Sequence, residues 1–146
     1  MSLAQQNVVV LAYPRYQELD FWYPVLRGRE EGATVHIVAA GPEGCESILG
    51  YPVVPDTASS DVDPAGVGLI VVPGVAAGEG PAASAEQIAL VSAVHAAGGL
   101  VAAVGNGAEV VGAALPGASD RIVRAAGTDD LATFFGAVRA ALAAPA

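Results

Sequence analysis

The chain has 146 residues, 53% of them apolar, and a formal net charge of −9 at pH 7. This length suits one domain with its own core, so we predict a single domain over 1–146. Only six residues are basic, and this acidic balance would repel the phosphates of a nucleic acid. The lone cysteine, Cys45, excludes an internal disulfide and a multi-cysteine metal site, and the absence of lysine excludes Schiff-base chemistry.

Membrane, secretion and cofactor signals are also missing from the sequence. No apolar run approaches the roughly eighteen residues that a membrane span needs, and 1–6 lack the basic and apolar segments of a secretion signal. His36 and His95 have no metal-ligand spacing, and the glycines of 105–110 lack the third glycine or alanine of a dinucleotide fingerprint. We therefore expect a cytoplasmic protein with no membrane segment, no metal and no cofactor.

The first half of the chain alternates strand patterns with one helix pattern. The continuous β-branched run at 7–12 predicts a strand buried on both faces of a parallel sheet, and 34–39 predicts a second strand. Between them, four apolar residues recur at helical spacing and predict a first crossover helix that ends at Gly32: Leu19, Trp22, Tyr23 and Leu26. The Gly- and Pro-rich stretch 41–56 predicts a hairpin or an irregular excursion.

The second half continues the same alternation. Runs at 67–72, 100–104 and 121–124 predict three more strands, and 108–114 predicts a short helix. Ser84 and Gln87 form a capping-box pattern that opens a helix ending at Gly98-Gly99. Thr128 is predicted to cap a last helix with one apolar face, which carries Leu131, Phe134, Phe135, Val138 and Leu142.

This order of elements predicts the fold class and the place of a site. Strands that alternate with helices favour right-handed βαβ units, hence an α/β, flavodoxin-like, doubly wound parallel sheet in a three-layer α/β/α sandwich. Ligands of such sheets bind beyond the carboxyl ends of the strands. The loops of interest therefore follow Ala12, Val72 and Val104.

Three motifs in these loops resemble the ThiJ/PfpI family, and the resemblance extends from Val8 to about Val111. The residues 18–24 match the opening motif of the family, an acidic residue in the first helix followed by a proline. The match puts Asp20 at the acidic site position of the family. The segment 73–75 matches a Gly-Gly turn whose backbone amide helps to bind an oxyanion, with Val75 in place of the second glycine.

The third motif, 102–107, matches the strand-to-helix elbow that carries the nucleophilic cysteine of the family. Here Gly105 stands at the cysteine position and Asn106 at the following histidine. The resemblance also implies that several tens of family residues are absent before Arg121, so the fold is expected to be shortened before the C-terminal helix. Because the family usually associates through helices beside the site, it further implies a homodimer.

Glycine at the elbow predicts a loss of covalent catalysis. Gly105 has no side chain to form a thiolate, and it tolerates the strained positive φ of such a turn. Cys45 lies in a loop between acidic residues that would raise its pKa, so we interpret it as an incidental thiol.

The polar residues of the motifs each have a structural alternative. Asp20 is a general acid or base with a raised pKa, the cap of a helix that begins near Phe21, or both. Glu18 either faces the pocket or is a solvated loop carboxylate. Asn106 either donates to a carbonyl or carboxylate, together with the Val75 amide and the helix N-terminus, or is a left-handed turn residue.

We therefore predict a non-catalytic ThiJ/PfpI-like protein with a remnant pocket and a binding or regulatory role. The pocket would take a small anionic or carbonyl-like ligand, and its residues are predicted to be Asp20, Glu18, Gly74, Val75, Gly105 and Asn106. The alternative is a small hydratase, lyase or amidase-like enzyme that uses Asp20 and a water molecule in place of a cysteine.

Overall fold

The computed structural model describes residues 3–144, which form a six-stranded parallel sheet in the order β5-β2-β1-β6-β7-β8. The strands are β1 (Asn7–Leu11), β2 (Thr34–Ala39), β5 (Thr57–Ala58), β6 (Leu69–Val72), β7 (Leu100–Val104) and β8 (Ile122–Ala125). Without the short edge strand β5, the order is the 2-1-3-4-5 of flavodoxin-like folds. The chain reverses its direction of winding between β1 and β6, which lie side by side.

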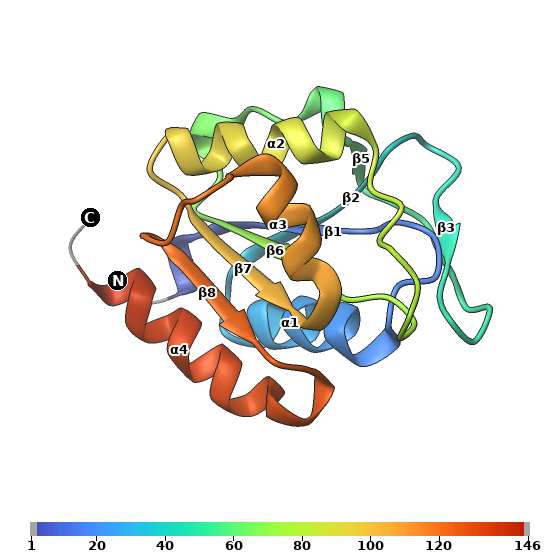
Figure 1. The fold of residues 1–146 in the computed structure, drawn as a ribbon. Helices are drawn as coiled ribbons and strands as arrows, with labels where there is room; N and C mark the ends of the chain where they lie inside the picture. The colour runs from blue at the N-terminus through green and yellow to red at the C-terminus, as the bar shows by residue number, and fades with distance from the viewer. Residues whose placement is uncertain (1–2, 145–146) are drawn as a thin grey trace.

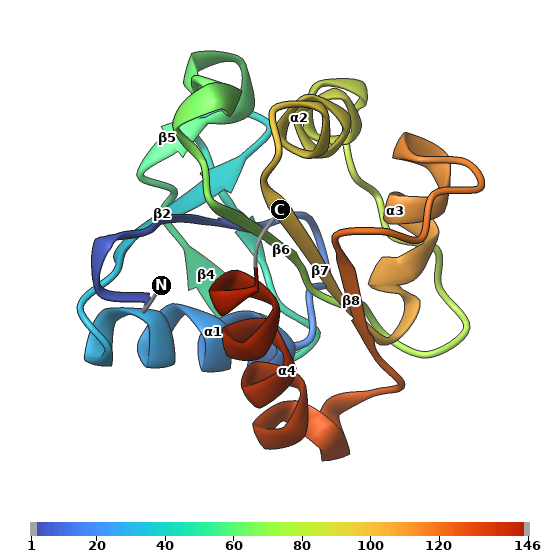
Figure 2. The same ribbon diagram turned by 90° about the vertical axis from the view of Figure 1, so that its left-hand side faces the viewer.

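Four helices cover the sheet in two layers (Figures 1 and 2). They are α1 (Glu18–Glu30), α2 (Ala85–Ala96), α3 (Ala108–Ala114) and α4 (Leu131–Ala143). The helices α1 and α4 pack on one face with one set of buried side chains, and α2 and α3 pack on the other face with a second set. Every residue of β6 and β7 is buried, because both faces of these strands are covered. The predicted three-layer α/β fold is confirmed.

The helix α1 packs only in part through the stripe that its apolar spacing defines, since Trp22 and Tyr23 are partly buried against the core. Leu19 and Leu26 are 56% and 57% exposed, whereas Phe21 and Val25 are fully buried. The approach to the sheet is close at Gly28, where a Cβ would lie 2.9 Å from Cγ2 of Val35. Two apolar stripes adjoin on this helix, and the one that carries the small residue faces the sheet.

The predicted caps have different outcomes. Ser84 and Gln87 make both bonds of the capping box at the start of α2, as predicted. Thr128 lies in a 3-10 turn before α4, and no side chain caps α4 itself, so the capping role predicted for Thr128 is wrong. The predicted apolar face of α4 is buried at all five positions, Leu131, Phe134, Phe135, Val138 and Leu142.

The stretch 41–56 contains the expected hairpin, made of β3 (Cys45–Glu46) and β4 (Pro52–Val53). The strand β5, two residues long, follows it and joins the main sheet beside β2, which the sequence pattern does not predict. The 3-10 turns are Leu3–Gln5, Ser59–Asp61, Pro64–Gly66, Gly105–Gly107 and Thr128–Asp130. That 1–146 form a single domain stays a prediction.

Within residues 3–144, no helix is both long enough and apolar enough to cross a membrane.

Candidate functional site

A hollow of about 410 Å³ lies at the carboxyl edge of the sheet, where α1 begins and where β6, β7 and β8 end. Its lining includes Asp20, Val75, Gly105, Asn106, Gly127 and Thr128. Four of the residues predicted for the pocket are therefore in its wall. They come from α1 and from the segments after β6 and β7, which are far apart in the sequence. These segments meet because parallel strands bring their carboxyl ends to one edge.

The carboxyl group of Asp20 is held at the base of this hollow. Asp20 is the third residue of α1 and only 3% exposed, and its own backbone amide donates to the side chain of Gln17, which caps the helix. The capping alternative for Asp20 is therefore wrong. Its Oδ2 accepts from the Gly74 amide at 3.2 Å, and its Oδ1 accepts from the Thr128 hydroxyl at 2.8 Å. Asp20 thus joins α1 to the loop after β6 and to the turn before α4.

Burial raises the pKa of Asp20, and the hydrogen bonds from Thr128 and Gly74 oppose this rise without cancelling it. The folded state consequently favours the neutral carboxyl, and the stability that this preference contributes at low pH is lost as the pH rises through the folded pKa. Tyr13, also buried, donates its hydroxyl to the Pro73 carbonyl, and burial and the charge of Asp20 raise its pKa.

Gly74 is where the acidic side chain and the elbow meet. A Cβ at this position would lie 2.8 Å from Oδ2 of Asp20, 3.0 Å from Oδ1 of Asn106 and 3.1 Å from the carbonyl of Val104. A residue without a side chain is therefore required for these groups to gather around the turn.

Asn106 binds the loop after β6 with its side chain. Its Oδ1 accepts from the Val75 amide at 2.8 Å, and its Nδ2 donates to the carbonyls of Ala76 at 3.4 Å and Glu79 at 3.2 Å. Among residues 3–144, positive φ outside glycine occurs only at Arg15 and Arg121, so the left-handed turn alternative for Asn106 is wrong. The Val75 amide, predicted to receive a ligand, already has an acceptor within the chain.

Gly105 has the predicted left-handed backbone, with φ of 55°. A Cβ built on it would meet only the Ala126 carbonyl oxygen, at 3.9 Å, which is an ordinary contact. The position at which the family resemblance expects a thiol is thus open to the hollow. Cys45 lies away from it in β3, and burial raises its pKa to about 11. The raised pKa agrees with the prediction, but burial is the cause and the neighbouring acids are not.

Glu18 makes its contact outside the hollow, with the hairpin loop. Its Oε2 accepts from the Leu49 amide at 2.8 Å, and it does not line the hollow. Burial raises its pKa, but hydrogen bonds from Ser47 and from the Leu49 amide outweigh burial, and the pKa is lowered. Glu18 therefore ties α1 to the hairpin loop.

Sequence reasoning missed the role of Thr128. Thr128 and Asp20 are 108 positions apart in the chain, and nothing local to either residue predicts their hydrogen bond. A threonine two or three residues before an apolar helix is typical of a cap, which hid its contact with the acid.

The sheet order and the acidic residue at its carboxyl edge define a flavodoxin-like α/β protein with a strand-to-helix elbow. The model of the DJ-1/PfpI family matches residues 6–123, and the chain belongs to this family. A curated relative from Archaeoglobus fulgidus, called an uncharacterized protein, is 34% identical over 68 residues. The match covers 47% of this chain, which spans 40% of that relative.

Solved structures support the same fold. A cysteine-to-alanine mutant of a DJ-1 superfamily protein from Salmonella typhimurium has a TM-score of 0.82 at 23% identity, over 94% of this chain and 90% of its own. DJ-1beta from Drosophila melanogaster has a TM-score of 0.77 at 18% identity, over 98% of this chain and 91% of its own. A ThiJ/PfpI domain protein from Brachyspira murdochii has a TM-score of 0.77 at 16% identity, over 96% of this chain and 97% of its own. At these identities the likeness concerns the fold alone.

Proposed function

We propose that this DJ-1/PfpI-family protein is non-catalytic and binds a small anionic or carbonyl-like molecule in the hollow beside Asp20, in a binding or regulatory role. The observation that carries the proposal is Gly105, which faces the hollow where a nucleophile would stand. Among the described lining residues, the other candidate nucleophiles are the hydroxyl of Thr128, which donates to Asp20, and the Asp20 carboxyl group, which accepts from Gly74 and Thr128.

The backbone donors of the hollow also argue against acyl-transfer chemistry. Preorganised amides that stabilise an oxyanion are a main source of catalysis in such reactions. Here the Gly74 amide donates to Asp20, and the Val75 amide donates to Asn106. Both amides after β6 are satisfied within the chain, so neither is available for a developing negative charge.

When Asp20 is protonated, its carboxyl group would favour a ligand that carries an acceptor oxygen. A protonated carboxyl has a proton to donate, and the nearest hydroxyl oxygen is that of Thr128. If Oδ1 of Asp20 donates to Oγ1 of Thr128, the Thr128 hydroxyl proton is released toward the hollow. It can then donate to the carbonyl or carboxylate oxygen of a ligand.

The test is a titration of the ¹⁵N-labelled full chain with acetate, acetamide and pyruvate, followed by NMR. We expect at least one probe to shift the amide signals of 105–107 and 127–128 saturably, without being converted. Thr128→Val should weaken this binding about tenfold, as expected for the loss of one hydrogen bond. Thr133→Val, an exposed site on α4, should leave it unchanged.

Two results would contradict the binding proposal: no saturable shift with any of the three probes, or equal affinity in the wild type and Thr128→Val.

The alternative is a small hydratase, lyase or amidase-like enzyme that uses Asp20 and water. The raised pKa of Asp20 in an open hollow favours it, because perturbed carboxyl groups are typical of general acids and bases. Turnover of a probe that Asp20→Asn abolishes would support this enzyme and overturn the non-catalytic proposal. Turnover that survives Asp20→Asn would exclude Asp20 as its acid or base.

We also propose that the chain forms a homodimer in the cytoplasm. The five most exposed large apolar side chains of residues 3–144 all lie on α1 and on the stretch 41–56 that contains the hairpin, which we call the hairpin segment. They are Leu19, Leu26, Leu49, Tyr51 and Val54. The segment runs beside the helix, since Leu49 donates to Glu18 and Asp56 lies 4.0 Å from Arg29. Apolar side chains gathered over adjoining elements suit a second copy.

The dimer is tested by size-exclusion chromatography with light scattering. A charge placed inside such a contact costs several kcal/mol, so Leu49→Asp should weaken association by about 100-fold or more. Thr133→Asp, on the exposed face of α4, should leave the dimer intact. A wild-type chain that stays monomeric at high concentration would contradict the proposal.

A further inference from the structure

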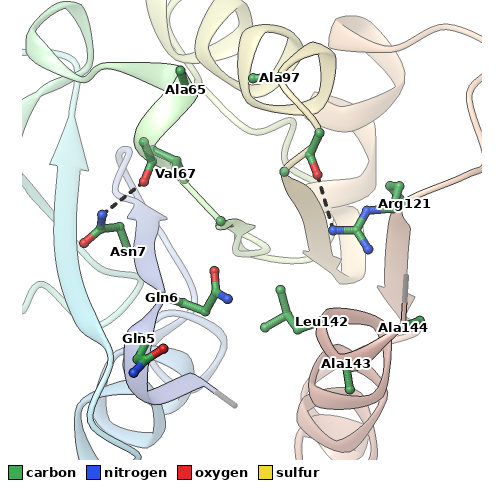
Figure 3. A pocket seen from close by; sticks show the side chains of 14 residues that line it. Gln5, Gln6, Asn7, Ala65, Val67, Ala97, Arg121, Leu142, Ala143 and Ala144 are labelled. Carbon is green, nitrogen blue, oxygen red and sulfur yellow. Dashed lines mark hydrogen bonds between the residues drawn. The ribbon is translucent and has the colours of Figure 1, made fainter. Parts of the chain in front are cut away.

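A second hollow, of about 530 Å³, lies at the opposite edge of the sheet, where the strands begin (Figure 3). Its wall is formed by 5–7 before and at the start of β1, by the loops 65–68 and 97–99, by Arg121 and by the end of α4. It shares no lining residue with the hollow beside Asp20. It is therefore a separate cavity, which the proposed function does not use.

Arg121 is held rigidly in the wall of this second hollow. Its guanidinium donates from Nη1 to the Ala141 carbonyl at 3.1 Å and from Nη2 to the Gly98 carbonyl at 3.3 Å. Its backbone is left-handed, with φ of 57°, a conformation that costs about 1 kcal/mol or more for a residue with a Cβ. A glycine would form this turn more easily, but it has no side chain to make these two hydrogen bonds.

Within the described part of the chain, the charge of Arg121 has no carboxylate partner. Four arginines, Arg15, Arg27, Arg29 and Arg139, lie within 4.0 Å of a carboxylate oxygen. Like the exposed Arg124, Arg121 has no such partner among residues 3–144, although the chain carries 15 acidic residues. Its two acceptors are neutral carbonyls at the ends of α2 and α4, and its Nε is buried without an acceptor. A half-buried cation without a counter-ion favours an anion from solution.

The other residues of the wall limit which class of anion could bind there. The side chains of Leu142 and Gln6 extend toward the middle of the hollow from the side facing Arg121 (Figure 3). The amides of Gly66, Val67 and Gly68 donate to carbonyls of the chain, so this glycine-rich wall offers no nest for a phosphate. One guanidinium beside an apolar side chain matches a single carboxylate with a short apolar tail.

We propose that this hollow binds a small organic monocarboxylate, with the carboxylate on the guanidinium of Arg121 and the apolar tail against Leu142. The hydrogen bonds from the guanidinium to the carbonyls of Ala141 and Gly98 hold it in place before the ligand binds. Less side-chain entropy is then lost on binding.

The test uses the full ¹⁵N-labelled chain with butyrate, its neutral isostere butyramide and inorganic phosphate at matched ionic strength. We expect butyrate to shift the amide signals of Gly68, Gly98 and Gly99 saturably. Butyramide should bind at least about tenfold more weakly, because a hydrogen bond to a charged group contributes about 1.5–3 kcal/mol. Phosphate should bind at least about tenfold more weakly because it has no apolar tail to pack against Leu142. Arg121→Gln should abolish the butyrate shifts, and Arg124→Gln, at an exposed site on β8, should keep them.

A second variant keeps the test decisive if Arg121→Gln unfolds the chain by releasing the ends of α2 and α4. Ala143→Glu leaves Arg121 in place and adds a carboxylate to the wall, so it should compete with butyrate and weaken its binding. Ala140→Glu, exposed on α4 and outside the wall, should bind butyrate as the wild type does. Equal binding of butyrate and butyramide, phosphate binding as tight as butyrate, no saturable shift, or unchanged butyrate binding in Ala143→Glu would overturn the proposal.

Discussion

Replacing Gly105 by cysteine is expected to create a thiol that iodoacetamide alkylates at least about 20-fold faster than Cys45 at neutral pH. The thiolate is the reacting form, and a pKa of about 11 leaves Cys45 with very little of it. A thiol with an ordinary pKa near 8.5 has roughly 300 times more thiolate at pH 7. Its lower intrinsic nucleophilicity reduces that advantage to about 20- to 30-fold, and access through the hollow would increase it.

The substitution is expected to be tolerated. A Cβ at position 105 has ordinary contacts, so the cost is the positive φ, about 1–2 kcal/mol. Time-resolved mass spectrometry of digested samples measures alkylation of the two thiols in the same molecule. Thr133→Cys, on the exposed face of α4, supplies the rate of a fully accessible thiol. If the new thiol at position 105 reacted no faster than Cys45, the hollow would not be open at this position, and the binding proposal would lose its main support.

Replacing Gly107 by alanine is expected to destabilise the protein by about 3 kcal/mol, the upper part of the range for overpacking a rigid site. A Cβ there would lie 2.7 Å from the carbonyl oxygen of Pro73 and closer still to that of Val72. Both atoms belong to the main chain at the end of β6, which cannot move aside as a flexible side chain could. The elbow that positions Gly105 and Asn106 would have to shift away from the strand.

Gly112→Ala is the matched control, since it adds the same methyl group inside α3 where nothing lies within 4 Å. It should stabilise the helix by roughly 0.5–1 kcal/mol, because alanine loses less backbone entropy than glycine. Gly107 already has helical angles, with φ of −56°, so the difference between the two variants isolates the clash. Urea unfolding measures the free energy of unfolding of both variants. A loss below about 1 kcal/mol for Gly107→Ala would mean that the elbow does not need this close approach.

The strands of the core could be predicted because their pattern is local. The residues of β6 and β7 are apolar without interruption, which is typical of strands covered on both faces. The strand β5 could not be predicted, since two residues carry no periodicity and its pairing with β2 depends on where the hairpin returns the chain. The apolar pattern also could not predict which face of α1 packs on the sheet. Its two apolar stripes adjoin, and the close approach at Gly28 decides between them.

At the site, the family motifs predicted positions but not partners. They placed Asp20 in the first helix and Val75, Gly105 and Asn106 after strand ends, and the structure brings these four into one wall. They also included Glu18, whose carboxylate instead accepts from Leu49 in the hairpin loop. The bonds that Asn106 makes to residues 75–79 depend on the path of a loop, which no local pattern in the sequence describes.

The sequence by itself determined the alternation of elements, the family and the absence of a thiol at Gly105, because burial patterns and residue identity are local properties of the chain. Only the tertiary structure decided what surrounds that position. In the folded chain Thr128 donates a hydrogen bond to Asp20, 108 positions away, and the Val75 amide donates to Asn106. Hydrogen bonds of this kind depend on how separate loops meet at one edge of the sheet, and that meeting is fixed by packing across the whole core.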